Sequence, residues 1–223
     1  MRACLLYLVS LGLAVSSVAS GSEEDRRITL PRAETAGEMS VEQALKKRRS
    51  VREFRRGGLS LDDVAQLLWA AQGITHREGY RTAPSAGALY PLELYLVVGD
   101  TGLLSPGVYL YTPKRHDLIR VTDGDRRRAL AKAAIDQDWV RRAPAVLVIS
   151  GIYERSTVKY GRRAQRYMYI EVGHVAQNVY LQATALRLGT VLVGAFHTAE
   201  VQKVLELPAD HEPLGIMPIG RKR

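Results

Sequence analysis

Hydrophobic residues recur at helical spacing in several stretches of the chain, most of them bounded by a capping residue. Ser40-x-x-Gln43 has the form of a capping box and predicts a short helix that ends in a cationic stretch. Ser60 opens a second helix, which Gly73 closes. The longest periodic segment predicts a helix over residues 163–188, ended by a glycine. Shorter helices are predicted over residues 126–135 and 198–205.

Shorter apolar runs, bounded by turn residues, predict strands between these helices. Residues 108–121 have the pattern of a hairpin with a polar tip, and residues 144–150 form a continuous apolar run typical of a buried strand. Residues 74–91 are rich in Gly, Pro, Ser and Thr and predict a long ordered loop. Further strands are predicted over residues 92–98, 191–196 and 214–219. A length of 223 residues, 46% of them hydrophobic, suits a single domain.

The first twenty residues have the pattern of a cleavable secretory signal, with a charge at Arg2, mostly apolar residues 3–15 and small residues after them. The apolar run is short for a membrane-spanning helix, which needs about twenty residues. An uncleaved amphipathic or core helix is the alternative. We expect a signal peptide over residues 1–20, a linker over 21–39 and one domain over 40–223. The protein would then be secreted or periplasmic, with no membrane attachment after processing.

The chain carries 32 basic and 23 acidic residues, a net charge of +9. Its basic clusters are spread along the sequence without the spacing of a nucleic-acid-binding module, so we expect an anionic cofactor and no nucleic-acid partner. The five histidines are isolated, and the single cysteine, Cys4, lies in the signal, so no metal site is predicted. No nucleophile elbow, P-loop or Gly-x-Gly-x-x-Gly motif is present, which argues against a hydrolase, an NTPase and a Rossmann dehydrogenase.

The stretch from residue 44 to 54 concentrates cations and one hydroxyl group at the exit of the first helix. In an extended chain, Arg48, Ser50 and Arg52 project from one side, and Arg49 projects from the other. Guanidinium groups beside a hydroxyl suit the oxygens of a phosphate. The alternative is a solvated basic helix end, favoured by the helix dipole.

Together with two other motifs, this stretch resembles the nitroreductase family of flavoproteins. These motifs are Arg81-Thr-Ala-Pro-Ser-Ala-Gly-Ala-Leu-Tyr-Pro91 and the closing Gly215-Ile-Met-Pro-Ile-Gly-Arg-Lys-Arg223. Within the family, the run Pro84–Pro91 and the Gly-His-x-x-Gln-Asn run from Gly173 to Asn178 are most similar to the SagB-type dehydrogenases. The resemblance covers residues 41–223. It implies an α+β fold, with a mostly antiparallel sheet flanked by helices, and an intertwined homodimer with FMN at its interface.

The resemblance also assigns residues to the flavin. It places Pro84, Ser85, Ala86 and Gly87 along the ring, and these small residues would let a flat ring approach the main chain. Without the resemblance, the alternative is that this segment is an ordinary loop. The phosphate end would be held by the cationic stretch, in which Arg52 lies nearer the ribityl chain and the N1 edge. Arg48, Ser50 and the terminal Arg221 are assigned to the phosphate, and Arg49 and Arg52 complete the cofactor-binding residues predicted in these basic segments.

The segment from Val191 to Phe196 resembles the part of nitroreductases whose backbone amide faces the flavin N5. The matched positions are Gly194 and its neighbour Ala195. Many members carry an acid just before that glycine, where this chain has Val193, so a role that needs the carboxylate is in doubt. A buried strand that ends in a turn fits this segment equally well.

Lys159 and Tyr160 stand where SagB-type enzymes that oxidise azolines have a Lys-Tyr pair implicated in proton removal. An exposed lysine beside a packed tyrosine is the structural alternative. The resemblance predicts an FMN-dependent oxidoreductase for a small-molecule or peptide substrate, with NAD(P)H as one candidate electron donor. The alternative function is an exported flavin-binding or protein-interaction module that has kept the fold with little or no turnover.

Overall fold

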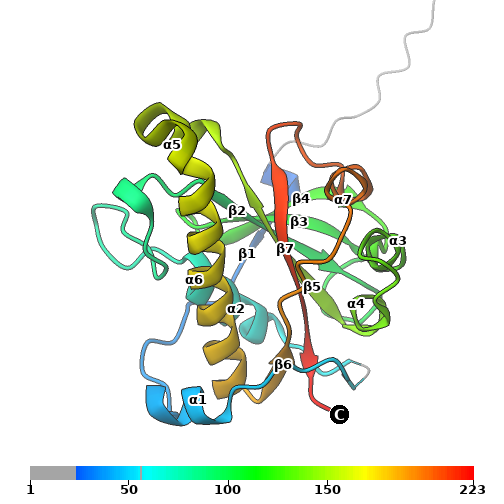
Figure 1. The fold of residues 1–223 in the computed structure, drawn as a ribbon. Coiled ribbons are helices and arrows are strands. Elements are labelled where there is room, and N and C mark those ends of the chain that lie inside the picture. Colours follow the sequence, from blue (N-terminus) through cyan, green and yellow to red (C-terminus); the bar gives the residue numbers. More distant parts are fainter. Residues whose placement is uncertain (1–23, 56) are drawn as a thin grey trace, which may run out of the picture.

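A seven-stranded antiparallel sheet runs through the centre of the molecule in a computed structural model, which describes residues 24–55 and 57–223 (Figure 1). The strands are β1 (Arg27–Thr29), β2 (Leu92–Val98), β3 (Gly107–Thr112), β4 (Asp117–Asp123), β5 (Ala145–Gly151), β6 (Leu188–Thr190) and β7 (Glu212–Arg221). Their order across the sheet is β1-β4-β3-β2-β5-β7-β6. The expected signal segment, residues 1–20, lies outside the described residues.

Helices cover both faces of the sheet, which confirms the α+β class (Figure 1). The helices are α1 (Val41–Lys47), α2 (Leu61–Gln72), α3 (Arg127–Ala133), α4 (Asp138–Arg142), α5 (Glu154–Tyr160), α6 (Ala164–Ala185) and α7 (Thr198–Leu205). Short 3-10 turns, η1 (Glu24–Arg26), η2 (Ala86–Ala88) and η3 (Gly161–Arg163), complete the described elements. Helices α2 and α6 lie on one face, and α3, α4 and α7 lie on the other. In the described part of the chain, no helix is long and apolar enough to cross a membrane.

The hydrophobic core forms two clusters because the central strands are buried on both faces. Leu94 and Leu96 of β2 pack into the cluster beneath α2 and α6, whereas Tyr95 and Val97 pack into the cluster beneath α3 and α7. The predicted cap of α2 is confirmed, since Ser60 forms a reciprocal capping box with the third residue of that helix. The sheet therefore gives the loops at its edges a rigid support.

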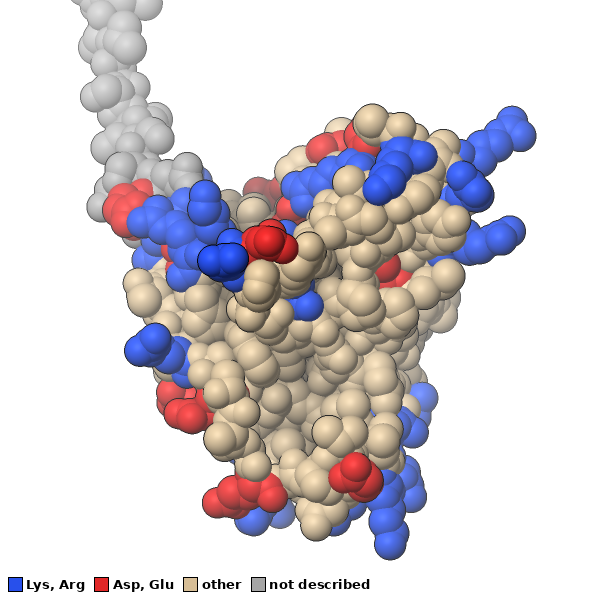
Figure 2. Space-filling view, turned by 90° about the vertical axis from the view of Figure 1, so that its left-hand side faces the viewer, with Lys and Arg blue, Asp and Glu red and all other residues tan. Residues whose placement is uncertain are grey.

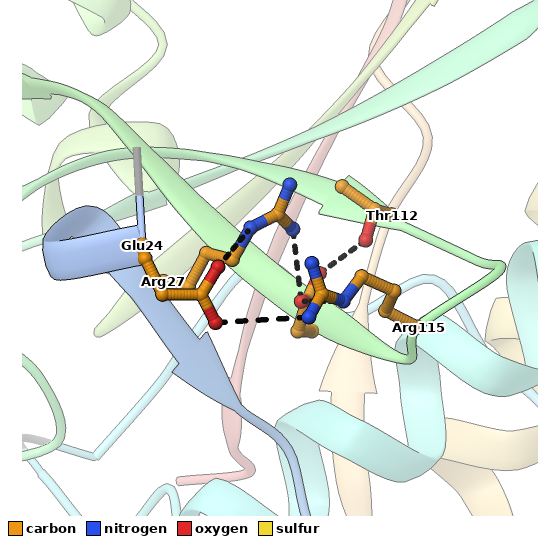
Figure 3. Close-up of polar contacts among 5 residues, drawn as sticks. Glu24, Arg27, Thr112 and Arg115 are labelled. Carbon is orange, nitrogen blue, oxygen red and sulfur yellow. Dashed lines mark hydrogen bonds and ion pairs between the residues drawn. The ribbon is translucent and has the colours of Figure 1, made fainter. Parts of the chain in front are cut away.

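The expected linker over residues 21–39 is wrong in its central part. Residues 27–29 form β1 and pair with β4, so that Arg27 lies opposite Ile119. Figure 3 shows the polar contacts that hold this strand: Arg27 donates to Asp117 at 2.9 Å, and Arg115 reaches both Asp117 and Glu24. Thr112 also donates to Asp117. The linker prediction failed because three residues are too few to show an apolar period.

The predicted strand over residues 191–196 is also misplaced. The strand in this region is β6, at residues 188–190, and only an isolated bridge from Val193 to Ile216 follows it. Gly189 lies within β6 and does not end α6, which stops at Ala185. A Cβ on Gly189 would lie 2.6 Å from the Val51 side chain, so this glycine lets the cationic stretch approach the sheet.

Candidate functional site

The cationic stretch leaves α1 and runs extended beside β6, as the sequence predicted. Ser50 forms a parallel bridge with Thr190, and the Val51 amide donates to the Thr190 carbonyl at 2.9 Å. Further along, Phe54 bridges to Lys222 at the end of the chain. The backbone of residues 50–54 is therefore fixed by the sheet, while the polar side chains on this segment stay exposed.

Arg48 and Ser50 meet at the ring of Tyr180 on α6. The Arg48 guanidinium lies 5.1 Å from the ring centroid, and the Ser50 and Tyr180 hydroxyls are 3.2 Å apart. The Tyr180 hydroxyl also accepts from the Leu192 amide at 2.7 Å. Tyr180 thus joins the cationic stretch to the segment before Gly194. Sequence reasoning missed it, because one tyrosine on a long helix carries no signal of its own.

The other cofactor-binding arginines that the sequence predicted lie apart from this pair. The Arg52 guanidinium lies 5.5 Å from the Trp139 ring centroid on α4. Arg49 turns back and donates to two carbonyls at the end of α1. Arg221 uses its guanidinium within the fold, donating to the Asp63 carboxylate at 2.7 Å and to the carbonyls of residues 58 and 186. Arg48 and Arg52 form no ion pair with any residue that the structure describes.

Gly194 and Ala195 form an exposed turn at the edge of the sheet. A Cβ on Gly194 would meet nothing within 4 Å, so the turn is open to a flat group. The Gly194 amide has no hydrogen-bond partner among the described residues, whereas the Ala195 carbonyl accepts from the Gln137 side chain at 2.9 Å. The Gln137 side chain therefore fixes the turn, and the Gly194 N–H remains available to a ligand.

The loop of residues 84–88 is fastened to α6 by a buried carboxylate. Glu171 is 3% exposed, and its Oε1 accepts from the Ala86 amide at 2.9 Å. Burial raises the pKa of Glu171, while hydrogen bonds from Ala86 and Ser85 oppose that rise. Ser85 also accepts from the Tyr90 amide at 2.9 Å. The Ala86 amide is therefore engaged within the chain, whereas the Gly87 amide has no partner among the described residues.

Lys159 and Tyr160, at the end of α5, lie against the tip of the same loop. A Cβ built on Gly87 would be 2.6 Å from the Tyr160 hydroxyl and 2.8 Å from the Lys159 ammonium. Gly87 also has a φ of +62°, a conformation that favours glycine. The Tyr160 ring packs edge-on against Tyr167, with 4.9 Å between the ring centroids. The structure thus brings the predicted Lys-Tyr pair to the predicted flavin loop.

Helix α5, which carries this pair, is tied to the sheet by Arg155. Its guanidinium lies 2.6 Å from the Glu93 carboxylate on β2 and donates to the Tyr90 carbonyl at 3.3 Å. A cavity of about 270 Å³ opens between the loop and α6. Its lining comprises Pro84, Ser85, Ala86, Tyr167, Ile170, Glu171 and His174.

Apart from the three arginines that lie elsewhere, the predicted residues form two groups, which lie on opposite flanks of α6. Glu171 holds the loop of residues 84–88, and Tyr180 holds the cationic stretch. Nine residues separate them, which at 3.6 residues per turn places them about 180° apart around the helix axis. The helix core side, with Val172 and Val179, lies between them. One copy of the chain therefore presents two half-sites that face in different directions.

Comparison with known proteins identifies the family of the chain. The family model described as the nitroreductase family matches residues 45–221. A nitroreductase-like protein of Methanocaldococcus jannaschii is 49% identical over 185 residues, which are 83% of this chain and 92% of that protein. The crystal structure of a nitroreductase-like protein from Ralstonia eutropha superposes with a TM-score of 0.78 at 30% identity, covering 89% of this chain and 90% of that one.

A third relative is the NADPH-flavin oxidoreductase of Vibrio harveyi, which is 32% identical over 111 residues. This match covers 46% of each chain. The family model spans both half-sites, from the cationic stretch to the end of β7. The chain therefore belongs to the nitroreductase family.

Proposed function

We propose that the chain is an FMN-dependent oxidoreductase of the SagB type, with Lys159 and Tyr160 at the reacting end of its site. The observation that carries the proposal is the contact of both side chains with Gly87, in the loop that the resemblance assigns to the flavin. Membership of the nitroreductase family supports the oxidoreductase class. The name of the Vibrio harveyi relative supports a flavin and makes NADPH a candidate donor.

The residues present fit FMN. Arg48 and the Ser50–Tyr180 hydroxyl pair offer a cation and one free hydroxyl donor to a phosphate, since one of the two hydroxyls donates to the other. Arg52 lies apart from them, beside Trp139, which suits the N1 edge, and the free Gly194 amide suits N5. Bound FMN would supply hydride acceptance at N5, and the chain would supply binding, orientation and positive charge. Because Arg221 already pairs with Asp63, its part in phosphate binding would require that ion pair to be shared.

In this proposal, Lys159 and Tyr160 remove a proton from the substrate. Loss of hydride from a substrate carbon must be accompanied by proton removal, and the hydroxyl and ammonium groups at Gly87 are the nearest polar side-chain atoms to the loop tip. The edge-on contact with Tyr167 and the Arg155–Glu93 ion pair hold α5 in place. Tyr160 is therefore positioned before a substrate arrives.

The functional unit in this proposal is a homodimer, because each copy holds only half-sites on opposite flanks of α6. An exposed apolar surface supports this: Ile170 on α6 is 50% exposed, and Val41 and Leu45 on α1 are also exposed. Figure 2 shows a broad area without charged side chains on this side of the molecule. A second copy on that surface would bring the cationic stretch of one chain to the loop of the other.

A second candidate function is an exported flavin-binding module with little turnover. Val193 favours it, because many family members have an acid at that position, and the export signal expected in residues 1–20 separates the protein from cytosolic nicotinamides. For the native protein, mass spectrometry would test export: we expect a mature chain that begins near Gly21, and a chain that retains residues 1–20 would contradict it.

The visible spectrum of the purified protein tests the main proposal. We expect a yellow protein with one non-covalent FMN per chain, whose flavin absorbance bleaches when a substrate or NAD(P)H is added without oxygen. A colourless protein that FMN does not reconstitute would overturn the proposal. A protein that binds FMN but is reduced by neither nicotinamide nor any peptide or small-molecule candidate would favour the binding module.

A further inference from the structure

A group of exposed cations lies where α5 meets α6, next to the Lys159–Tyr160 pair. We call this group, Arg162, Arg163 and Arg166, the basic corner. None of the three forms an ion pair with another residue in the described part of the chain. Figure 2 shows Lys and Arg side chains projecting from the upper part of the molecule, at the height of α5 in Figure 1.

Many cations elsewhere on the surface have a carboxylate partner. Examples are the ion pairs Arg120–Asp123, Arg126–Glu206, Arg127–Asp125 and Arg142–Asp138. Like charges one helical turn apart repel each other, so an external anion bound at a cluster without acids would relieve this repulsion. Arg48 and Arg52 also form no ion pair with an acid, and the proposed FMN site would account for them. No part of the proposed flavin site accounts for the basic corner.

The spacing within the corner favours an extended chain over a small anion. Arg162 and Arg166 are four residues apart, which corresponds to about 6 Å along a helix. In an extended peptide, side chains on one side repeat every two residues, or about 6.6 Å. Val158, four residues before Arg162, is 92% exposed and offers an apolar contact beside the corner. A small anion would instead need donors that converge on one point.

We propose that the basic corner docks an acidic segment of a peptide substrate. An acidic run on the corner would place the adjoining part of the same peptide at Tyr160 and Gly87, since η3 connects the corner directly to the end of α5. The proposal rests on the proposed function, because it names the substrate of that site as a peptide with carboxylates beside the reacting residue. Lys159 is not counted in the basic corner, because the proposed function assigns it to proton transfer.

The test is a binding measurement that needs no turnover. A fluorescent peptide of alternating Glu and Ser residues is titrated with FMN-loaded protein, and its anisotropy is recorded; a peptide with Gln in place of Glu serves as the uncharged probe. The corner variant is R162Q/R163Q/R166Q. The matched control, R128Q/K132Q/K203Q, removes three charges from exposed residues of α3 and α7. FMN absorbance is read on every sample.

We expect the corner variant to bind the acidic peptide between about threefold and about 150-fold more weakly, since each exposed charge contact contributes about 0.2–1 kcal/mol. The control should bind as the parent does, and raised salt should weaken parent binding. Equal loss in both variants, no loss in either, or equal binding of the Gln peptide would overturn the docking proposal. An oligonucleotide that competes as well as the acidic peptide would also overturn it. Normal peptide binding by protein that holds no FMN would instead count against the flavin function alone.

Discussion

Replacing Gly87 with alanine tests the contact on which the candidate site depends. The new Cβ would lie 2.6 Å from the Tyr160 hydroxyl and 2.8 Å from the Lys159 ammonium. Ordinary contacts between such atoms are about 3.5 Å, so one group must move by roughly 1 Å. The lysine side chain is flexible, but the Tyr160 ring is held edge-on by Tyr167, so the displacement falls partly on the tyrosine.

Backbone strain must be separated from this clash, and Gly79 provides the control. Gly79 has a φ of +84° and a Cβ there would meet nothing within 4 Å, so Gly79→Ala has the strain without the clash. The left-handed conformation costs an alanine about 1–2 kcal/mol in either variant. We expect Gly87→Ala to lower the free energy of unfolding by more than Gly79→Ala does. A shift of about 1 Å at a reacting group can reduce turnover by about 100-fold, and only Gly87→Ala should show such a loss.

Two measurements decide the outcome. Urea denaturation gives the free energy of unfolding of both variants, and acetylation footprinting by mass spectrometry gives the reactivity of Lys159 relative to Lys132, an exposed lysine on α3. We expect Lys159 reactivity to change in Gly87→Ala and to stay at the parent value in Gly79→Ala. Equal stability and unchanged Lys159 reactivity in the two variants would show that the pair does not lie against Gly87 in solution.

Three further substitutions separate cofactor binding from reaction. Arg48→Ala should weaken FMN binding by about ten- to a hundredfold, through loss of a charge-assisted contact of about 1.5–3 kcal/mol; an unchanged FMN titration would remove Arg48 from the site. Tyr160→Phe should keep bound flavin while turnover falls by about 100- to 10,000-fold; turnover at the parent rate would make the pair structural. Glu171→Gln should gain stability over the parent as pH rises. Burial raises the folded-state pKa of Glu171, so the stability that its protonated form contributes to the parent is lost as pH rises from the unfolded pKa through the folded pKa. A difference in the free energy of unfolding that stays constant from pH 4 to 8 in urea denaturation would contradict this.

The sequence predicted the elements with a strong hydrophobic period. The structure confirms the predicted helices α2 and α6 and the predicted strands β2 and β5. Each has many apolar residues that pack into the core, so its hydrophobic period is clear in the sequence. Helix α5 was not predicted. Only one of its residues, Ser156, is buried, and its one aliphatic side chain, Val158, is almost fully exposed, so no period marks it. Its position comes from Arg155 and Glu93, which are 62 residues apart in sequence.

In the candidate site, too, the residues fixed by contacts distant in sequence were the ones not predicted. The motifs that resemble the nitroreductase family located the cationic stretch, the loop of residues 84–88 and the Lys-Tyr pair. Glu171 was missed because the amide that it holds, at Ala86, is 85 residues away, and an acid on an amphipathic helix reads as a solvent-facing residue. A strand was predicted over residues 191–196 because the apolar run favours one, whereas the Leu192 amide bonds to Tyr180 and not to a neighbouring strand.

The arrangement of the half-sites around α6 leads to a test of subunit complementation. In the proposed dimer, each flavin site takes its cationic stretch from one copy and its loop and Lys-Tyr pair from the other. When chains carrying Arg48→Ala are mixed with chains carrying Tyr160→Phe, each heterodimer has one site with both changes and one site with neither. Random exchange should restore about a quarter of the parent turnover at limiting FMN, although each variant alone is impaired. If the complete site belonged to one copy, every site would retain a defect, and mixing would restore nothing.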